Sequence, residues 1–248
     1  MIVYDHTHPT WLARYGRHGR TNGAFTYSRD ICKWHLPIWR ELLGHDESIS
    51  TCGKVPGVTV QYLHERTHVD LSSETKLFVT TYKDLADALG PRGLWLPNTI
   101  DEAVLPDHRP SKDWVYFGNI IGEKRKPFDK LGGLNFDVIS GVKDQQSSLE
   151  QVAQYRYGIG VGRCALEMMA IGLKVLIFGK ALGGLILSQN DFDLQQQANF
   201  NGNVITGVAS VSEGVARISE AIPIAPTFQK SIADIERRIA EAWERVRA

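Results

Sequence analysis

Short apolar runs, separated by turn residues, charges and brief helical patterns, dominate the first hundred residues. The runs are MIVYD, SISTC, VTVQYLHE, KLFVTT and GLWLPN. Runs of this length that end in glycine, proline or charged residues predict buried β-strands. Between them, YKDLADALG predicts a short helix that ends at Gly90. Ile31, Trp34 and Ile38 lie near helical spacing and predict a further helix, with a kink expected at Pro37.

The alternation of strand and helix resumes in the second half of the chain. WVYFGNI and FDVISG predict strands, SSLEQVAQY predicts a helix that begins at a serine, and RCALEMMAIG predicts a helix that stops at Gly172. PNTIDEAVLPDHRPSKD, between the halves, has three prolines, many charges and little periodicity. We therefore expect an α/β protein with two parallel-sheet, Rossmann-like lobes that face a central cleft.

The boundaries of the expected parts follow from these patterns. Residues 1–98 form the first lobe, 99–113 the linker and 114–230 the second lobe. Residues 231–248 carry apolar side chains three or four positions apart, which predicts a final helix that would pack back on the first lobe.

Composition narrows the class of protein further. The 248 residues include 28 Lys and Arg and 28 Asp and Glu, so the whole chain has no charge that would draw it to nucleic acid or membrane. Cys32, Cys52 and Cys164 form no CxxC pair, which favours a reducing compartment. No apolar run approaches the roughly 18 to 20 residues that span a bilayer, and MIVYDHTHPTW lacks the pattern of a signal peptide. We expect a cytoplasmic protein without a membrane span.

The glycine-rich stretch YGIGVGRCALEMMAIG raises the question of a nucleotide site. We expect its three glycines, Gly158, Gly160 and Gly162, in a turn before the helix, where backbone amides can hold an anion. Arg163 and Glu167 are four residues apart and share one helix face, where an Arg suits a phosphate and a carboxylate suits ribose hydroxyls. The spacing is not G-x-G-x-x-G, however, and such glycines often serve packing. These residues alone favour the packing interpretation.

A family resemblance changes this balance. GRCALEMMAIGLKVLIFG resembles the nucleotide-sugar motif of GT-B glycosyltransferases, G-x-x-x-L-E-A-M-A-x-G-x-P-V, with Met168 in place of the usual alanine and Lys174 in place of proline. LWLPNTID resembles the PNGVD that ends the first lobe in this family. YFGNIIGEKRK resembles the opening of its second lobe, and HGRTNGAFTYSRDI its early glycine-rich loop. The matches follow the family's order along most of the chain, with a short first lobe.

The resemblance implies a donor site for a nucleoside-diphosphate sugar, a UDP- or GDP-sugar. Glu167 would hold the ribose and Lys124 the diphosphate, with Arg163 and the amides around Gly162 as helpers. No metal is required if these cations neutralise the diphosphate. Three other glycines would let the backbone approach the donor: Gly23, Gly118 and Gly184. Retaining members often carry a second Glu eight positions before the ribose Glu, and Ile159 stands there.

The acceptor side is expected in the first lobe. His64 follows an apolar run, at the carboxyl end of a predicted strand, where it could act as a base or orient the acceptor, or simply pair with Glu65. Asp5 and His6 end the first strand and would contact the acceptor, serve as a base or only fill a polar strand end. The DHTH cluster there could also bind a metal, but no second ligand cluster follows it.

Residues 1–40 suggest what the acceptor is. They hold six Lys and Arg against two Asp, interleaved with aromatic side chains. This pattern fits DNA or another polyanion, such as a hydroxymethylated base that is flipped into the cleft, although the tryptophans also fit a core. The expected activity is sugar transfer to an acceptor hydroxyl. A sugar-nucleotide epimerase or hydrolase and a non-catalytic nucleotide-sugar-binding protein of the same fold remain alternatives.

Overall fold

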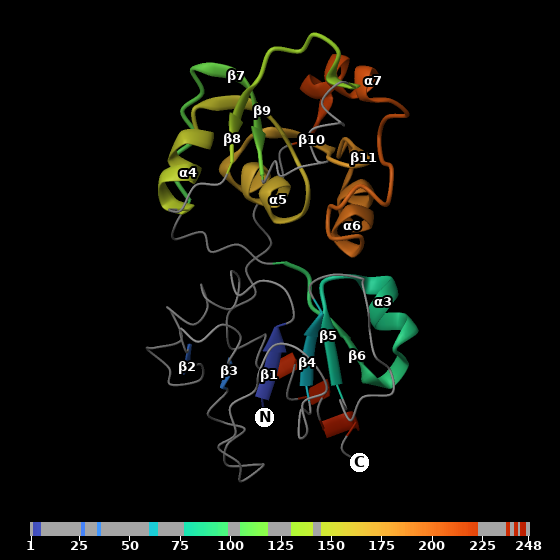
Figure 1. The fold of residues 1–248 in the computed structure, drawn as a ribbon. Coiled ribbons are helices and arrows are strands. Elements are labelled where there is room, and N and C mark those ends of the chain that lie inside the picture. Colours follow the sequence, from blue (N-terminus) through green and yellow to red (C-terminus); the bar gives the residue numbers. More distant parts are fainter. Residues whose placement is uncertain are drawn as a thin grey trace. The chain divides into compact units, whose positions relative to one another are not determined.

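The chain divides into two compact units, which comprise residues 1–97 with 230–248, and residues 98–229. A computed structural model (Figure 1) describes residues 2–5, 26–27, 34–35, 60–63, 77–98, 105–118, 130–140, 145–222, 237–238, 241–242 and 244–246. Before residue 77, only the backbone of the strands is described. Both units are α/β, with mixed and mainly parallel sheets that are consistent with a Rossmann-like fold.

The first unit contains a six-stranded sheet in the order β2-β3-β1-β4-β5-β6. Its strands are β1 (Ile2–Asp5), β2 (Thr26–Tyr27), β3 (Trp34–His35), β4 (Val60–Leu63), β5 (Leu77–Thr80) and β6 (Gly93–Trp95). β1, β4, β5 and β6 run parallel, so their carboxyl ends share one edge of the sheet. Helix α3 (Lys83–Ala88) and the 3-10 turn η2 (Gly90–Arg92) connect β5 to β6. The strands predicted from MIVYD, VTVQYLHE, KLFVTT and GLWLPN are therefore confirmed.

The helix predicted around Trp34 is wrong. Trp34 and His35 form β3, which pairs antiparallel with both β1 and β2. The physical reason is tertiary, because Trp34 and His35 pair with two neighbouring strands, and such pairing outweighs a short helical pattern. The predicted strand SISTC lies outside the described residues.

The end of the chain belongs to the first unit. Residues 237–238, 241–242 and 244–246 are helical, and Ala242 is fully buried. Arg238 Nη2 donates a hydrogen bond to the carbonyl oxygen of Trp95, at 2.8 Å. This bond ties the final segment to β6.

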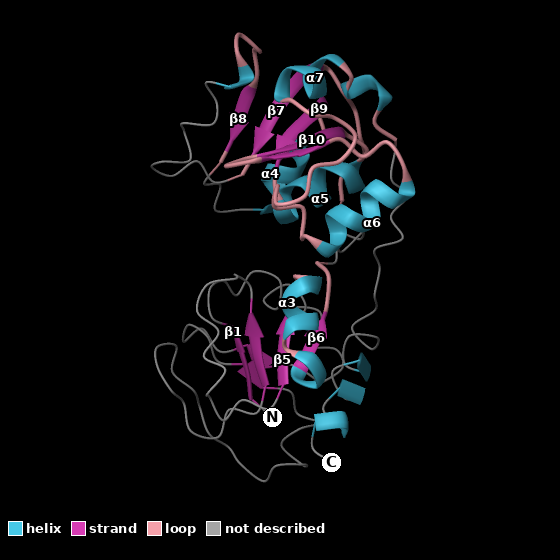
Figure 2. Ribbon diagram, turned by 90° about the vertical axis from the view of Figure 1, so that its right-hand side faces the viewer, coloured by secondary structure: helices cyan, strands magenta, loops and turns pink. Residues whose placement is uncertain are grey.

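The second unit contains a five-stranded sheet in the order β11-β10-β9-β7-β8. Its strands are β7 (Lys112–Phe117), β8 (Asp137–Ile139), β9 (Tyr155–Gly160), β10 (Lys174–Phe178) and β11 (Leu182–Gly184). Only β11 runs antiparallel to its neighbour. The helices are α4 (Gln145–Val152), α5 (Gly162–Ile171), α6 (Gln189–Gln197) and α7 (Val211–Ala216), followed by the 3-10 turn η5 (Ile218–Glu220). Figure 2 shows α4, α5 and α6 on one face of this sheet and α7 on the other.

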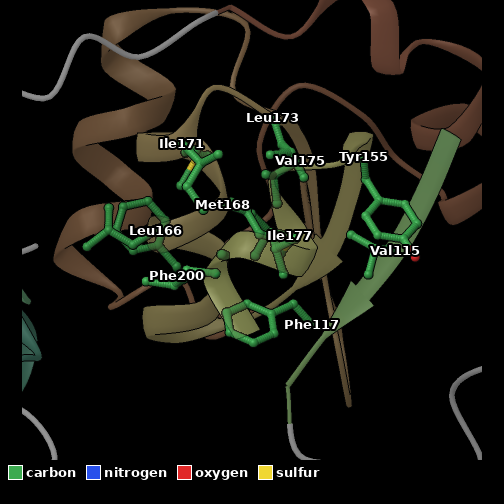
Figure 3. Close-up of a cluster of buried hydrophobic side chains, with 14 of the residues drawn as sticks. Val115, Phe117, Tyr155, Leu166, Met168, Ile171, Leu173, Val175, Ile177 and Phe200 are labelled. Carbon is green, nitrogen blue, oxygen red and sulfur yellow. The ribbon is translucent and has the colours of Figure 1, made fainter. Parts of the chain in front are cut away.

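Strand alternation divides the core of this unit into two layers. On β10, Val175 and Ile177 pack toward α5, whereas Leu176 and Phe178 pack toward α7. The α5 layer also contains Leu166 and Met168 of α5 itself, together with Phe200 after α6 (Figure 3). α5 is consequently fixed against the sheet, which positions its first turn. Among the described residues, no helix is long and apolar enough to cross a membrane.

Candidate functional site

The order of the strands marks one position on the edge of the second sheet. β7 lies between β8 and β9, so the chain leaves β7 toward one side and later returns on its other side. Ligands of open α/β sheets bind at such a switch point, beside the carboxyl ends of the strands. Gly118 follows β7 directly, and Gly162 and Arg163 begin α5 just after β9. Three of the predicted donor-site residues therefore meet at this edge.

Gly158 and Gly160 do not lie in a turn, and that prediction is wrong. Both belong to β9, and they alternate with Ile159, which is fully buried in the layer that faces α7. A Cβ on Gly158 would overlap Met168 Sδ, and a Cβ on Gly160 would lie 2.8 Å from Met168 Cε. The two glycines make room for Met168 of α5, so they serve packing rather than ligand access.

Gly162 marks the start of α5. Its φ is +58°, and its N–H donates a hydrogen bond to the carbonyl oxygen of Phe200 at 2.6 Å. That N–H therefore already has an acceptor within the protein. Arg163 belongs to the first turn of α5, and the N–H groups of a first turn lie outside the helix's own ladder of hydrogen bonds. Val161 at the N-cap gives no side-chain hydrogen bond to this turn. The helix start can therefore bind an anion through main-chain donors.

Arg163 and Glu167 share one face of α5, as predicted. Arg163 Nε donates to Glu167 Oε1 at 2.9 Å. The Glu167 side chain is only 3% exposed and that of Arg163 17%. A carboxylate this deeply buried is tolerated because a paired cation compensates its loss of water. The guanidinium thus orients and stabilises Glu167 at the switch point.

Ile159 occupies the position where retaining GT-B enzymes often have a second Glu. Its side chain is fully buried in the layer that faces α7. Arg163 and Glu167 lie on α5, which packs on the other face of the sheet. A carboxylate at position 159 would therefore point away from this ion pair.

Gly118 lies against Tyr116 of β7 and is hydrogen-bonded to β8. Its φ is +151°, and a Cβ there would lie 3.3 Å from the hydroxyl oxygen of Tyr116. Its N–H donates to the carbonyl oxygen of Ile139 at 3.1 Å. Burial raises the pKa of the Tyr116 hydroxyl, and the Cys164 sulfur raises it further. Tyr116 thus stays a neutral phenol beside this edge at physiological pH.

Gly184 serves packing within the second unit. Its φ is +91°, and a Cβ would overlap the carbonyl oxygen of Thr206. Gln195 Nε2 donates to the carbonyl oxygen of Gly183 at 2.6 Å and to Thr206 Oγ1 at 3.1 Å. The predicted donor loop at β11 is thereby held closely against the chain around Thr206.

Sequence reasoning missed a pair of asparagines near the start of α5. Asn98 Nδ2 donates to Asn199 Oδ1 at 2.5 Å, and both side chains are buried. Asn199 and Phe200 have φ values of 56° and 52°, a left-handed backbone that is rare outside glycine and most unusual for Phe. The run NFNGN after α6 is a sequence signal for such a backbone, since asparagine and glycine accept it most readily.

Several of the predicted site residues lie outside the part of the chain that the structure describes. His64, His6, Lys124 and Gly23 are not among the described residues, and Asp5 is described only as the last residue of β1. Its backbone pairs with Tyr62, one residue before β4 ends, at the carboxyl edge of the first sheet. In the part of the chain that the structure describes, no group of three or more His, Cys, Asp or Glu side chains could hold a metal ion.

The described site combines two chemical capacities. The first turn of α5 offers main-chain N–H donors to an anion, and Glu167 offers a buried carboxylate that Arg163 orients. Comparisons of the chain with models of known protein families, with curated proteins and with solved structures give no match.

Proposed function

We propose that this chain is a glycosyltransferase that moves a sugar from a nucleoside-diphosphate sugar to an acceptor hydroxyl. The proposal takes the two units as lobes of GT-B type, with the acceptor bound by the first and the donor by the second. One observation carries it: the buried Arg163–Glu167 pair begins α5 at the switch point of a parallel sheet. This pair stands within the segment that resembles the family's nucleotide-sugar motif.

The proposed roles follow from the chemistry of each group. The diphosphate lies at the start of α5 and against Lys124, where N–H donors and a cation stabilise the charge that develops on the leaving group. Glu167 accepts hydrogen bonds from the ribose hydroxyls, and the hydrogen bond from Arg163 Nε holds this carboxylate in place. These contacts bind the nucleotide and favour its departure.

The transfer step requires a base on the acceptor side. The acceptor oxygen forms a bond to the anomeric carbon of the sugar while the bond from that carbon to the diphosphate oxygen breaks. The acceptor proton passes to a base, for which we propose His64, with Asp5 and His6 as acceptor contacts. The nucleoside diphosphate leaves with the bonding electrons.

The burial of Glu167 sets a condition on this proposal. A side chain that is 3% exposed meets a ribose only if the nucleoside enters deeply beside the first turn of α5. A purely structural ion pair would instead stabilise α5 without affecting nucleotide affinity. Binding and stability must therefore be measured separately on the same variant.

The experiment measures thermal unfolding of the protein with UDP-glucose, GDP-mannose or dTDP-glucose, followed by calorimetric titration of the best binder. A ligand at 100 times its Kd should stabilise the fold by about 2.7 kcal/mol. Glu167→Gln preserves the shape of the side chain, and we expect it to weaken binding at least tenfold, by about 1.4 kcal/mol. No stabilisation by any of the three nucleotides would refute the donor site.

Glu213→Gln is the matched control for this experiment. Glu213 accepts a hydrogen bond from Arg217 Nη1 at 2.8 Å, also four residues apart, but this pair is only half-buried and begins in α7 on the opposite face of the sheet. We expect wild-type nucleotide affinity in this variant. If Glu167→Gln also keeps wild-type nucleotide affinity, the buried ion pair has only a structural role.

The acceptor is proposed to be DNA with a hydroxymethylated base, or another polyanion, bound through residues 1–40. Such binding should weaken steeply as the salt concentration rises, because counterions are released from the phosphates. Salt-independent binding would exclude this acceptor. A transferase releases free nucleoside diphosphate only when acceptor is present, whereas release without acceptor would indicate a hydrolase.

A further inference from the structure

Asn98 carries a buried polar atom that forms no hydrogen bond with any described residue. Only 5% of this residue is exposed, and its Nδ2 donates to Asn199 Oδ1 at 2.5 Å. In the described part of the chain, Asn98 Oδ1 has no hydrogen-bond partner. Buried side-chain oxygens are nearly always paired, so such an exception indicates a bound water or a ligand group.

The partner of Asn98 places this oxygen near the start of α5. Asn199 is itself 7% exposed, and its carbonyl oxygen lies 3.8 Å from the position that a Cβ on Gly162 would occupy. The next carbonyl, that of Phe200, accepts the N–H of Gly162 at 2.6 Å. The left-handed backbone of Asn199 and Phe200 builds this contact, although it costs conformational energy. The asparagine pair and the helix start are therefore parts of one local structure.

We infer that Asn98 is a ligand-binding residue of the second unit, whose Oδ1 accepts a hydrogen bond from a neutral O–H or N–H group flanking the ligand's diphosphate. This inference rests on the proposed function and deepens it. A carboxamide oxygen accepts hydrogen bonds only, and fully ionised phosphate groups offer no donor to it. The donor group must come from the transferred sugar or from the nucleoside. Asn98 thus recognises the sugar or the nucleoside that is attached to the diphosphate, while main-chain N–H groups of α5 bind the diphosphate itself.

The test measures the affinity of wild type and Asn98→Ala for three probes, UDP-glucose, UDP and inorganic pyrophosphate. GDP-mannose and GDP replace the uridine probes if they bind more tightly. A lost neutral hydrogen bond should reduce affinity by about threefold to tenfold. A loss for UDP-glucose alone assigns the contact to the transferred sugar. A loss for UDP-glucose and UDP, but not for pyrophosphate, assigns it to the nucleoside.

Two further variants separate binding from folding. Asn199→Gly removes the side chain that holds Asn98 and suits the backbone at φ 56°, so it should reproduce the selective loss with little change in Tm. Asn201→Ala is the matched control, because Asn201 lies in the same loop and its Oδ1 accepts the N–H of Asn203 at 2.8 Å. It should leave all three affinities unchanged.

Three outcomes would overturn the inference. If the affinities are unchanged in both Asn98→Ala and Asn199→Gly, Asn98 Oδ1 binds a water molecule and not the ligand. Equal losses for all three probes would make Asn98 a structural residue without selectivity. If the wild type binds none of the probes, the proposed function fails and this inference fails with it, a result distinct from the other two.

Discussion

Gly158 of β9 and Met168 of α5 form a contact whose energetics can be tested directly. A Cβ on Gly158 would overlap Met168 Sδ, and Met168 is fully buried. A Cβ on Gly160 would lie 2.8 Å from Met168 Cε and also 2.8 Å from the carbonyl oxygen of Phe117, which belongs to the rigid main chain of β7. The two glycines therefore differ in whether shortening Met168 can relieve the clash.

The expected magnitudes follow from this geometry. Gly158→Ala inserts one methyl group into a filled core, which should lower the free energy of unfolding by about 2 kcal/mol. Met168→Ala removes a buried side chain and should cost about 3 kcal/mol. The double variant should cost about 3 kcal/mol rather than the sum of about 5 kcal/mol, because the new methyl group occupies space that Met168 leaves. Gly160→Ala should keep most of its cost in the Met168→Ala background.

Urea-induced unfolding, followed by circular dichroism, measures these free energies for each variant. The midpoint should shift while the slope stays constant, provided that only stability changes. Strict additivity of Gly158→Ala and Met168→Ala would refute the packing account. Gly158→Ala without a stability cost, but with impaired nucleotide binding, would restore the ligand-access interpretation of the glycines.

Two further predictions concern the second unit. Gly172 has a φ of +114°, and a Cβ there would lie 3.1 Å from His108 Nδ1. Gly172→Ala should therefore lower the free energy of unfolding in urea by about 2 kcal/mol. Gly133→Ala, at φ +79° with no atom within 4 Å of the new Cβ, should lower it by about 1 kcal/mol. Equal costs would contradict the His108 contact. The Tyr155 hydroxyl donates to Asp137 Oδ2 at 2.6 Å and lowers the pKa of that carboxyl. The stability gained from this lowered pKa is present above about pH 4 and lost on acidification. Tyr155→Phe should therefore shrink the acid-dependent loss and raise the pKa of Asp137 in an NMR titration; an unchanged titration would contradict this.

Much of the fold is readable from the sequence because the core strands are short apolar runs bounded by turn residues. The stop of α5 at Gly172 was also predictable, since its left-handed conformation favours glycine at a helix end. Trp34 shows the limit of local patterns. Its spacing from Ile31 and Ile38 fits a helix, yet pairing with β1 decides its conformation. Tertiary pairing of this kind outweighs a short helical pattern.

The candidate site was predictable in part. Arg163 and Glu167 could be placed on one helix face from their spacing alone, and the structure brings them into contact. The glycines of β9 could not be assigned, because YGIGVG fits both a loop and a strand with small residues on one face. The Asn98–Asn199 contact joins residues 101 positions apart, so no local pattern could reveal it.

The central claim is that the second unit binds a nucleoside-diphosphate sugar at the first turn of α5. Amide hydrogen exchange of the whole chain, with and without whichever of UDP-glucose, GDP-mannose or dTDP-glucose stabilises it most, tests this claim most directly. We predict slower exchange over residues 161–167, and no such protection in Glu167→Gln at the same ligand concentration. Protection that leaves residues 161–167 unchanged, or that persists in Glu167→Gln, would contradict the claim.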